Sequence, residues 1–110
     1  AVSLQPGDLE TLRQLGIEQG QSGQLDAAVR TFSRAIQLYP KSSRDHYLLG
    51  RALAAMAQLG AAVPYFAQAV KLDPAMADCH YNLALLCEQL SRPREAIRHM
   101  AQYRKLVAKK

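Results

Sequence analysis

The sequence predicts an all-α protein built from three tandem helix-turn-helix repeats, and a 34-residue period is the first observation behind this prediction. Small or large apolar residues recur at equivalent positions: Gly16, Gly50 and Ala84; Ala28, Ala62 and Ala96; Phe32, Phe66 and Met100. The second observation is that apolar residues follow helical spacing between helix breakers. A period of this length indicates stacked units, each of which contacts only its neighbours.

The helices are expected in the following order along the chain. Residues 1–8 form a lead-in segment with Asp8 as an N-cap, because Pro6 and Gly7 interrupt any helical pattern. The repeat domain covers residues 9–110 and divides into repeats 9–42, 43–76 and 77–110. We expect six helices, at residues 9–22, 25–39, 43–57, 61–72, 76–90 and 94–108.

Glycine and proline residues set the expected helix ends. Gly20 and Gly23 should stop the first helix, and Pro40 should end the second. In the second unit, Ser42 or Ser43 caps the helix and Gly60 breaks the chain before the next one. Because a proline deep in a helix costs about 3 kcal/mol, Pro64 predicts that the fourth helix starts no earlier than Gly60 or begins with a distorted turn.

The pattern within each unit resembles the tetratricopeptide-repeat family. Its matching residues are Leu15-Gly16, Ala28, Phe32, Ala35 and Pro40 in the first unit, Leu49-Gly50, Ala62, Phe66, Ala69 and Pro74 in the second, and Leu83-Ala84, Ala96, Met100 and Tyr103 in the third. The third unit departs from the pattern, since Tyr103 and Arg104 replace residues that are small and apolar elsewhere. The resemblance implies a right-handed superhelical solenoid with an atypical last repeat.

The resemblance also implies a function, which is protein–protein interaction as a scaffold or adaptor. In this family the first helix of each pair lines a concave groove that binds an extended or helical peptide. The matching partner-binding residues are Arg13, Ile17, Arg44, Tyr47, Arg51, Asp78, Tyr81, Asn82, Leu85 and Glu88. Large apolar residues on one open surface favour a binding site over a merely solvated face.

The groove residues predict the chemistry of the partner segment. Tyr47 and Tyr81 occupy equivalent positions and suit an apolar centre. Arginines gather toward the first repeats and acidic residues toward the third, so we expect a segment that is acidic at one end and basic at the other. The carboxylate-clamp type of the family is not expected, because Ile17, Leu48 and Asp78 stand where its polar and basic residues would be.

Two other functions remain open at this point. The first is self-association into a homo-oligomer through exposed repeat ends. The second is binding of an acidic polymer, because the formal charge of +5 comes from residues 91–110, which hold seven basic residues and one acidic residue. Nucleic acid is disfavoured as a partner, since only Tyr103 interleaves with these basic residues as a stacking platform. Lysine and arginine also suit the negative end of a final helix.

No residue pattern indicates chemistry, and we expect neither catalysis nor a cofactor. No nucleophile with its base, phosphate-cradling loop or paired carboxylate stands out. His46 and His80 occupy the same position in successive units, which favours a packing role for a half-buried aromatic ring. No metal site is expected, because no set of four ligands is evident.

The cysteines and the apolar runs bear on localisation. Cys79 and Cys87 are eight residues apart in one expected helix, roughly 12 Å, which is too far for a disulfide. Reduced thiols favour a reducing compartment, so we expect a cytoplasmic protein. No apolar run reaches about 18 residues, so no membrane span is expected. Because the chain begins at Ala1 rather than Met, we interpret it as a processed product or an excised piece.

Overall fold

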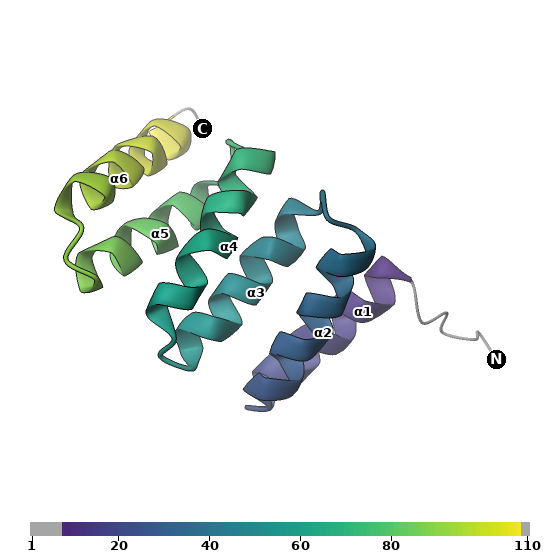
Figure 1. The fold of residues 1–110 in the computed structure, drawn as a ribbon. Helices are drawn as coiled ribbons and strands as arrows, with labels where there is room; N and C mark the ends of the chain where they lie inside the picture. The colour runs from purple at the N-terminus through teal and green to yellow at the C-terminus, as the bar shows by residue number, and fades with distance from the viewer. Residues whose placement is uncertain (1–7, 109–110) are drawn as a thin grey trace.

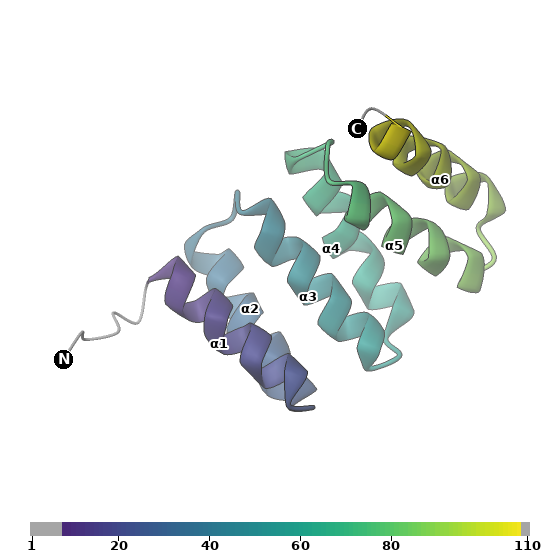
Figure 2. The same ribbon diagram turned by 180° about the vertical axis from the view of Figure 1, so that it is seen from behind.

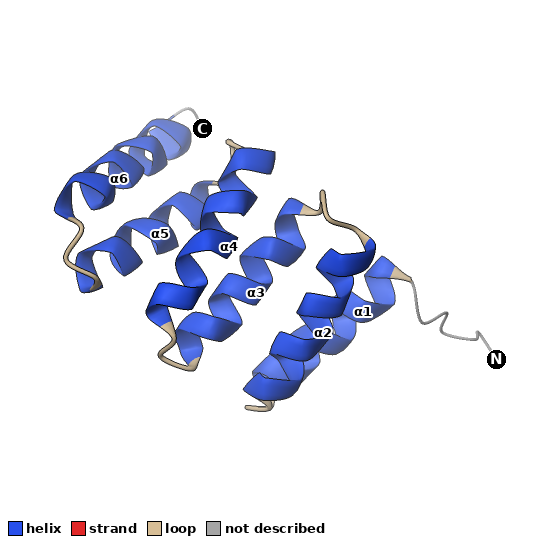
Figure 3. Ribbon diagram, in the orientation of Figure 1, coloured by secondary structure: helices blue, strands red, loops and turns tan. Residues whose placement is uncertain are grey.

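Helices make up all the regular secondary structure of residues 8–108, which are the residues that this computed structural model describes (Figure 3). They are α1 (Leu9–Gln21), α2 (Leu25–Leu38), α3 (Ser43–Ala55), α4 (Leu59–Leu72), α5 (Ala77–Gln89) and α6 (Pro93–Ala108). Residues 1–7 of the expected lead-in and residues 109–110 of the expected third repeat lie outside the described range. The prediction of six helices is confirmed for residues 8–108, with helix ends that differ from the expected ones by at most two residues.

The helices form three pairs that stack side by side into a solenoid. The two helices of each pair pack against each other, while α2 also contacts α3 and α4 also contacts α5. Figure 1 shows α2 and α4 on the near side, whereas the view from behind in Figure 2 shows α1, α3 and α5 side by side on the opposite face. The stack therefore presents the first helices of all three pairs on one surface.

Two side-chain caps begin the first helices of the first two pairs. The carboxylate of Asp8 accepts a hydrogen bond from the main-chain N–H of Glu10, at 3.2 Å. The hydroxyl of Ser42 accepts from the N–H of Asp45, at 3.4 Å. Both caps satisfy N–H groups that have no partner within the helix. Of the two serines considered as caps, Ser42 takes the role and Ser43 is the first residue of α3.

The turn inside each pair places a residue in the left-handed region of backbone space. Gly23, Ala57 and Ser91 have φ angles of 86°, 63° and 60°, and they are equivalent positions in the 34-residue period. The residue after each donates its N–H across the turn to a carbonyl near the end of the preceding helix. These bonds are Gln24 to Gln19, Gln58 to Leu53 and Arg92 to Cys87, at 2.8, 2.9 and 2.8 Å. This is a Schellman-type helix ending, which favours glycine at the left-handed residue.

The Ala57 turn explains why the expected start of the fourth helix is wrong. Because the turn closes at Ala57, α4 begins at Leu59, with Gly60 in its first turn and Pro64 inside it. Gly60 therefore does not break the chain. Pro64 cannot donate to the carbonyl of Gly60, but both residues are exposed, so water can reach that carbonyl.

We expect replacement of Ala57 by glycine to raise the free energy of unfolding by roughly 0.5–1 kcal/mol, because an L-residue is strained at positive φ and glycine is not. Ala57 is exposed, so its methyl group contributes little burial. Chemical denaturation followed by circular dichroism measures the change. The reverse substitution, Gly23→Ala, is the matched control and should destabilise by a similar amount. A destabilised Ala57→Gly variant would contradict this reading of the turn.

The core is formed by apolar residues that the period brings together between the helix pairs. Leu49, Phe66 and Leu83 are 1%, 1% and 2% exposed, as expected for residues of or next to the middle unit. The glycines at equivalent positions make room for aromatic rings. A Cβ at Gly16 would lie 2.5 Å from the ring of Phe32, and one at Gly50 would lie 3.1 Å from the ring of Phe66.

Both cysteines are free thiols buried in the core on α5, in agreement with the expectation of reduced thiols. Burial raises the pKa of Cys79 to about 12. Its thiol also donates a hydrogen bond to the main-chain carbonyl of Phe66, at 3.3 Å. The folded state therefore holds the neutral form of this group.

This raised pKa predicts that stability falls in alkali. The folded pKa lies above the ordinary value of 9.0, so the contribution of Cys79 is complete below pH 9 and is lost as the pH rises toward 12. At pH 10 the ionised thiol favours the unfolded chain by about 1.4 kcal/mol. Urea denaturation of wild type and Cys79→Ala at pH 8 and pH 10 should show a smaller loss in the variant. Equal losses would contradict the prediction.

Candidate functional site

The candidate site is the face formed by α1, α3 and α5, which we call the groove face. It carries the partner-binding residues expected from the sequence, and the structure divides them into two groups. One group is held between repeats by contacts within the protein. The other group is exposed and available to a partner.

Arg13 belongs to the first group, because it pairs with a buried carboxylate of the next repeat. Its Nε and Nη2 atoms donate to Asp45 at 3.2 and 3.1 Å, and Nη2 also donates to the hydroxyl of Ser42 at 3.3 Å. Asp45 is fully buried, at 0% exposure. The hydrogen bond with Asp45 raises the pKa of Arg13. The guanidinium therefore fastens α1 to α3, and Asp45 already balances its charge.

Tyr47 occupies the position equivalent to Arg13 and also lies between repeats. It is 6% exposed, and its ring packs on that of Phe66 at a centroid distance of 5.8 Å. Its hydroxyl accepts a hydrogen bond from Asn82 at 3.2 Å, and burial raises its pKa. The expectation of an open apolar face at Tyr47 thus differs from the structure, because Asn82 and the second repeat cover the ring.

The exposed group lies on α3 and α5 with Ile17 of α1 beside it. Arg44, Arg51, Asp78 and Glu88 are exposed, and Ile17 is half-buried. Tyr81 and Leu85 are 41% and 36% exposed. The ring of Tyr81 packs on that of Tyr103, at a centroid distance of 5.0 Å, which fixes its position on the surface. The apolar part of the groove face therefore centres on α5.

Two pockets open between successive repeats beside these residues. The first has a volume of about 350 Å³ and lies among α1, α2 and α3, with Ile17, Leu25 and Phe32 in its lining. The second has a volume of about 220 Å³ and lies among α3, α4 and α5. Leu59, Phe66 and Leu85 line the second pocket. Sequence reasoning missed both pockets, although the 34-residue spacing of Leu25 and Leu59 is a signal for them.

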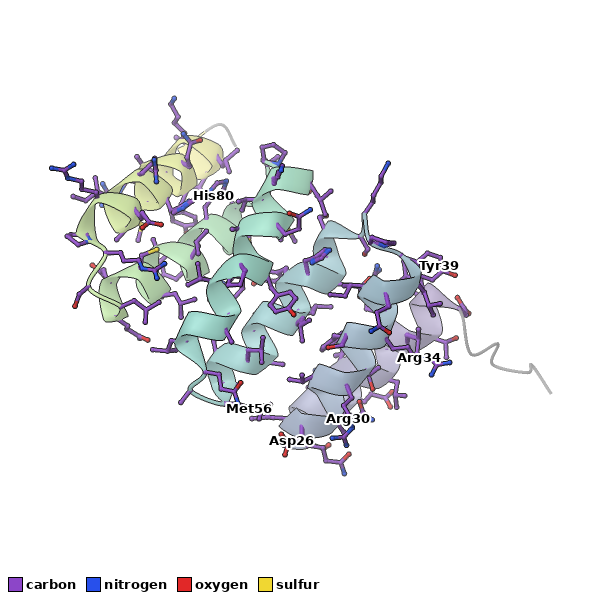
Figure 4. All side chains as sticks on the ribbon, viewed as in Figure 1. Asp26, Arg30, Arg34, Tyr39, Met56 and His80 are labelled. Atoms are coloured by element: carbon purple, nitrogen blue, oxygen red, sulfur yellow. The ribbon has the colours of Figure 1, made fainter. Side chains whose placement is uncertain are left out.

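The histidines are fixed by main-chain contacts. Nε2 of His46 lies 2.9 Å from the carbonyl oxygen of Pro40, and Nε2 of His80 lies 3.1 Å from that of Pro74. A carbonyl only accepts, so each Nε2 donates. His80 lies between α5 and α6, where its Nδ1 is 3.3 Å from Nδ1 of His99 (Figure 4). Burial, the adjacent His80 and Arg98 lower the pKa of His99.

Neither these rings nor the thiols form a metal centre in the described part of the chain. Residues 8–108 contain no group of three histidine, cysteine or acidic side chains that could hold a metal ion. Between the same residues, none of the helices combines the length and apolar character that crossing a bilayer requires.

The outer side of α2, opposite the groove face, carries a row of charged residues. Asp26, Arg30 and Arg34 project outward from α2 (Figure 4). They recur every four residues and are exposed, which is typical of a solvated helix face. Leu38 continues this row at the end of α2 and is 47% exposed.

Comparison with known proteins places the chain among helical repeats. A family model described as anaphase-promoting complex, cyclosome, subunit 3 matches residues 21–103. A crystal structure of MamA is similar at 25% identity and a TM-score of 0.87, and the match covers 92% of this chain and 59% of MamA. The chain therefore spans about three fifths of the MamA structure.

A second similar structure is the type III secretion translocator chaperone SycD of Yersinia enterocolitica, in an alternative dimer. It shares 26% identity and a TM-score of 0.87, with 93% of this chain and 77% of SycD covered. No curated protein matches the chain in sequence. The expected solenoid of three tandem helix pairs is thus confirmed by the fold of these proteins.

Proposed function

The chain belongs to the tetratricopeptide-type repeat family described as anaphase-promoting complex, cyclosome, subunit 3, and from this premise we propose that it binds a segment of a partner protein along the groove face. The observation that carries the proposal is the exposed apolar pair Tyr81 and Leu85 on α5, which stands near exposed charged residues of α3 and α5, and Leu85 lines the second of the two pockets. Apolar surface of this kind, rimmed by polar residues, is typical of interaction sites.

We propose that the chain acts as a scaffold or adaptor and carries out no chemistry. The candidate reactive groups have structural roles that support this view. Cys79 and Cys87 are buried, and His46 and His80 donate to main-chain carbonyls. One of the similar structures is named as a chaperone, which is also a protein-binding role.

The charges of the groove face suggest how a partner segment is oriented. Arg44 and Arg51 are exposed on α3, while Asp78 and Glu88 are exposed on α5. Because Asp45 balances Arg13, the positive part of the groove lies on α3 rather than on α1. We infer a segment that places acidic groups over α3 and basic groups beyond α5, with an apolar residue against Tyr81.

The test is capture of a partner by the isolated chain, followed by affinity measurements with that partner. Tyr81→Ala should weaken binding by at least about 1 kcal/mol, because exposed tyrosines are frequent hot spots. Arg51→Glu should slow association and change its salt dependence. The matched control is Arg34→Glu, which makes the same charge change on the outer side of α2. If both groove variants bind as wild type does while circular dichroism shows a normal fold, the groove face is not the site.

A peptide that ends in Glu-Glu-Val-Asp should show no micromolar binding to this chain. Recognition of such a tail needs several free cations and amides at its carboxylates. Here Arg13 is occupied by Asp45, Asn82 donates to Tyr47 and to the carbonyl of Asp78, and Asp78 itself would repel a carboxylate. Fluorescence anisotropy with the labelled peptide measures this, and saturable micromolar binding would overturn the expectation.

Self-association remains a second candidate, and the exposure of large apolar residues at both ends of the stack favours it. Leu15 on α1 is 44% exposed and Ile97 on α6 is 70% exposed. Against it, Tyr103 stands where Ala35 and Ala69 are fully buried, so a further helix would have to displace this ring to stack as α3 and α5 do. Sedimentation over a concentration series, with Ile97→Glu as the test variant, separates this function from partner binding.

A further inference from the structure

The two pockets of the groove face are the same structural feature repeated once. Their lining residues correspond across the 34-residue period, as the pairs Leu25 and Leu59, Phe32 and Phe66, and Ala52 and Leu86 show. Each pocket forms where the first helix of one pair meets the next pair. A ligand that runs along the groove face therefore meets two similar hollows in sequence. The first is lined mainly by apolar side chains, and the second combines apolar side chains with Arg51, Asn82 and Gln89.

Arg51 lines both pockets and separates them. Its side chain is exposed, and its guanidinium carbon lies 5.7 Å from the centroid of the Tyr47 ring. No acidic side chain among residues 8–108 forms an ion pair with it, whereas Arg13 pairs with both Glu10 and Asp45. The ring of Tyr47 is itself fixed by Asn82, so the cation has a defined position between the two hollows.

An arginine in this position suits a carboxylate, which is the acidic group of an unmodified peptide. The planar guanidinium matches a carboxylate in two parallel hydrogen bonds, and stacking on an aromatic ring leaves its N–H groups free to donate. The neighbouring apolar walls exclude water and strengthen such a contact. The apolar surface of the pocket walls is removed from water only when apolar side chains of a ligand fill the pockets, and this burial favours binding.

We propose that the partner segment carries two apolar side chains, one for each pocket, with an aspartate or glutamate between them that pairs with Arg51. The inference rests on the proposed function and names the chemistry of its ligand. Neighbouring packed helices lie about 8–10 Å apart, and a segment in the polyproline II conformation advances about 3.1 Å per residue and returns to the same side every three residues. The two apolar residues therefore stand three positions apart in a segment of this conformation, with both side chains toward the groove face. The larger first pocket takes the larger side chain.

Selection from a display library of random short peptides tests the pattern without knowledge of the natural partner. Wild-type chain should enrich peptides with two apolar residues three positions apart and an acidic residue between them. Arg51→Glu should enrich lysine or arginine at the middle position instead. Arg34→Glu, on the opposite face, should enrich the same peptides as wild type. Enriched peptides with no preference at the middle position would overturn the assignment of Arg51.

Filling the first pocket provides an independent test of the apolar positions. A Cβ at Gly20 would meet no atom within 4 Å, and Gly20 lines this pocket, so the side chain of Gly20→Leu starts in open space at the pocket wall and should fill part of the pocket. We expect it to weaken a selected peptide at least tenfold. Gly60→Leu is the matched control, because Gly60 is equally open and lines neither pocket. A peptide whose larger apolar residue is replaced by alanine should no longer distinguish Gly20→Leu from wild type.

The outcomes separate the ligand pattern from the groove itself. If selected peptides lose binding to Tyr81→Ala but not to Arg51→Glu or Gly20→Leu, the pattern is wrong and the groove face still binds. If no peptide is enriched, or if the enriched peptides bind all three variants as they bind wild type, both proposals fail. Circular dichroism of each variant shows whether the fold is kept, and the Gly60→Leu control reports any general effect of a helix glycine replacement.

Discussion

Replacing Phe66 by alanine should lower the free energy of unfolding by roughly 3–5 kcal/mol, because the ring is 1% exposed and its removal leaves a cavity that helices cannot fully close. The ring packs against Tyr47 at a centroid distance of 5.8 Å and lies over Gly50. Native domains are stable by only about 5–15 kcal/mol, so this single change consumes a large part of the total. Urea denaturation followed by circular dichroism measures it.

Leu38→Ala is the control for the Phe66 experiment. It also removes a large apolar side chain from a second helix of a pair, but Leu38 is 47% exposed and should cost far less. A Phe66→Ala variant that melts with wild type would show that the ring is not a central part of the core. Because Phe66 also lines the second pocket, the same result would contradict the position of its ring in that pocket.

Replacing Arg13 by alanine should cost a similar roughly 3–5 kcal/mol, although Arg13 is a surface-facing residue in the sequence pattern. The loss comes from Asp45, which is fully buried and would keep only the hydroxyl of Ser42 as a side-chain partner. A buried charge without its counter-ion is strongly unfavourable. Arg44→Ala, which removes an exposed arginine of α3, should change stability by less than about 0.5 kcal/mol.

A double variant distinguishes the ion pair from a general effect of losing Arg13. Replacing both partners, as Arg13→Leu with Asp45→Leu, removes the charges together and should recover most of the stability lost in Arg13→Ala. Denaturant midpoints and slopes of wild type, Arg13→Leu, Asp45→Leu and the double variant give the coupling free energy. A double variant that is no more stable than Arg13→Ala would show that the pair is not the reason for the loss.

The sequence predicted the helices well because helix periodicity is a local pattern, and the 34-residue period shows the same pattern in each of the three units. It predicted the start of α4 wrongly because alanine seldom adopts positive φ, and nothing in the residue type marks Ala57 as the end of a turn. Gly60 carried the expected signal, yet it lies within the helix. At Ala57 the turn geometry that all three repeats share determines the backbone conformation, although alanine itself disfavours positive φ.

The sequence predicted which helix face carries the candidate site, but it did not predict which residues of that face are exposed. Helical spacing placed Arg13, Tyr47 and Tyr81 at equivalent positions, and the structure confirms that all three lie on first helices. What covers each one depends on the next repeat, which supplies Asp45 against Arg13 and Asn82 against Tyr47. Contacts between residues more than 30 positions apart carry no sequence signal of their own in a single chain. The exposed set of binding residues therefore remains a proposal.

The close approach of the Phe32 ring to Gly16 has a consequence for how homologous repeats vary. No side chain fits at Gly16 while a rigid ring stands 2.5 Å from the site of its Cβ, and Gly50 with Phe66 repeats the arrangement. The third repeat has Ala84 and the unbranched Met100 at the same two positions, and both line one pocket. Substitutions at these two positions should therefore occur together in homologous repeats. A repeat with alanine in place of the glycine on the first helix should also have a flexible side chain, such as methionine, in place of the aromatic ring.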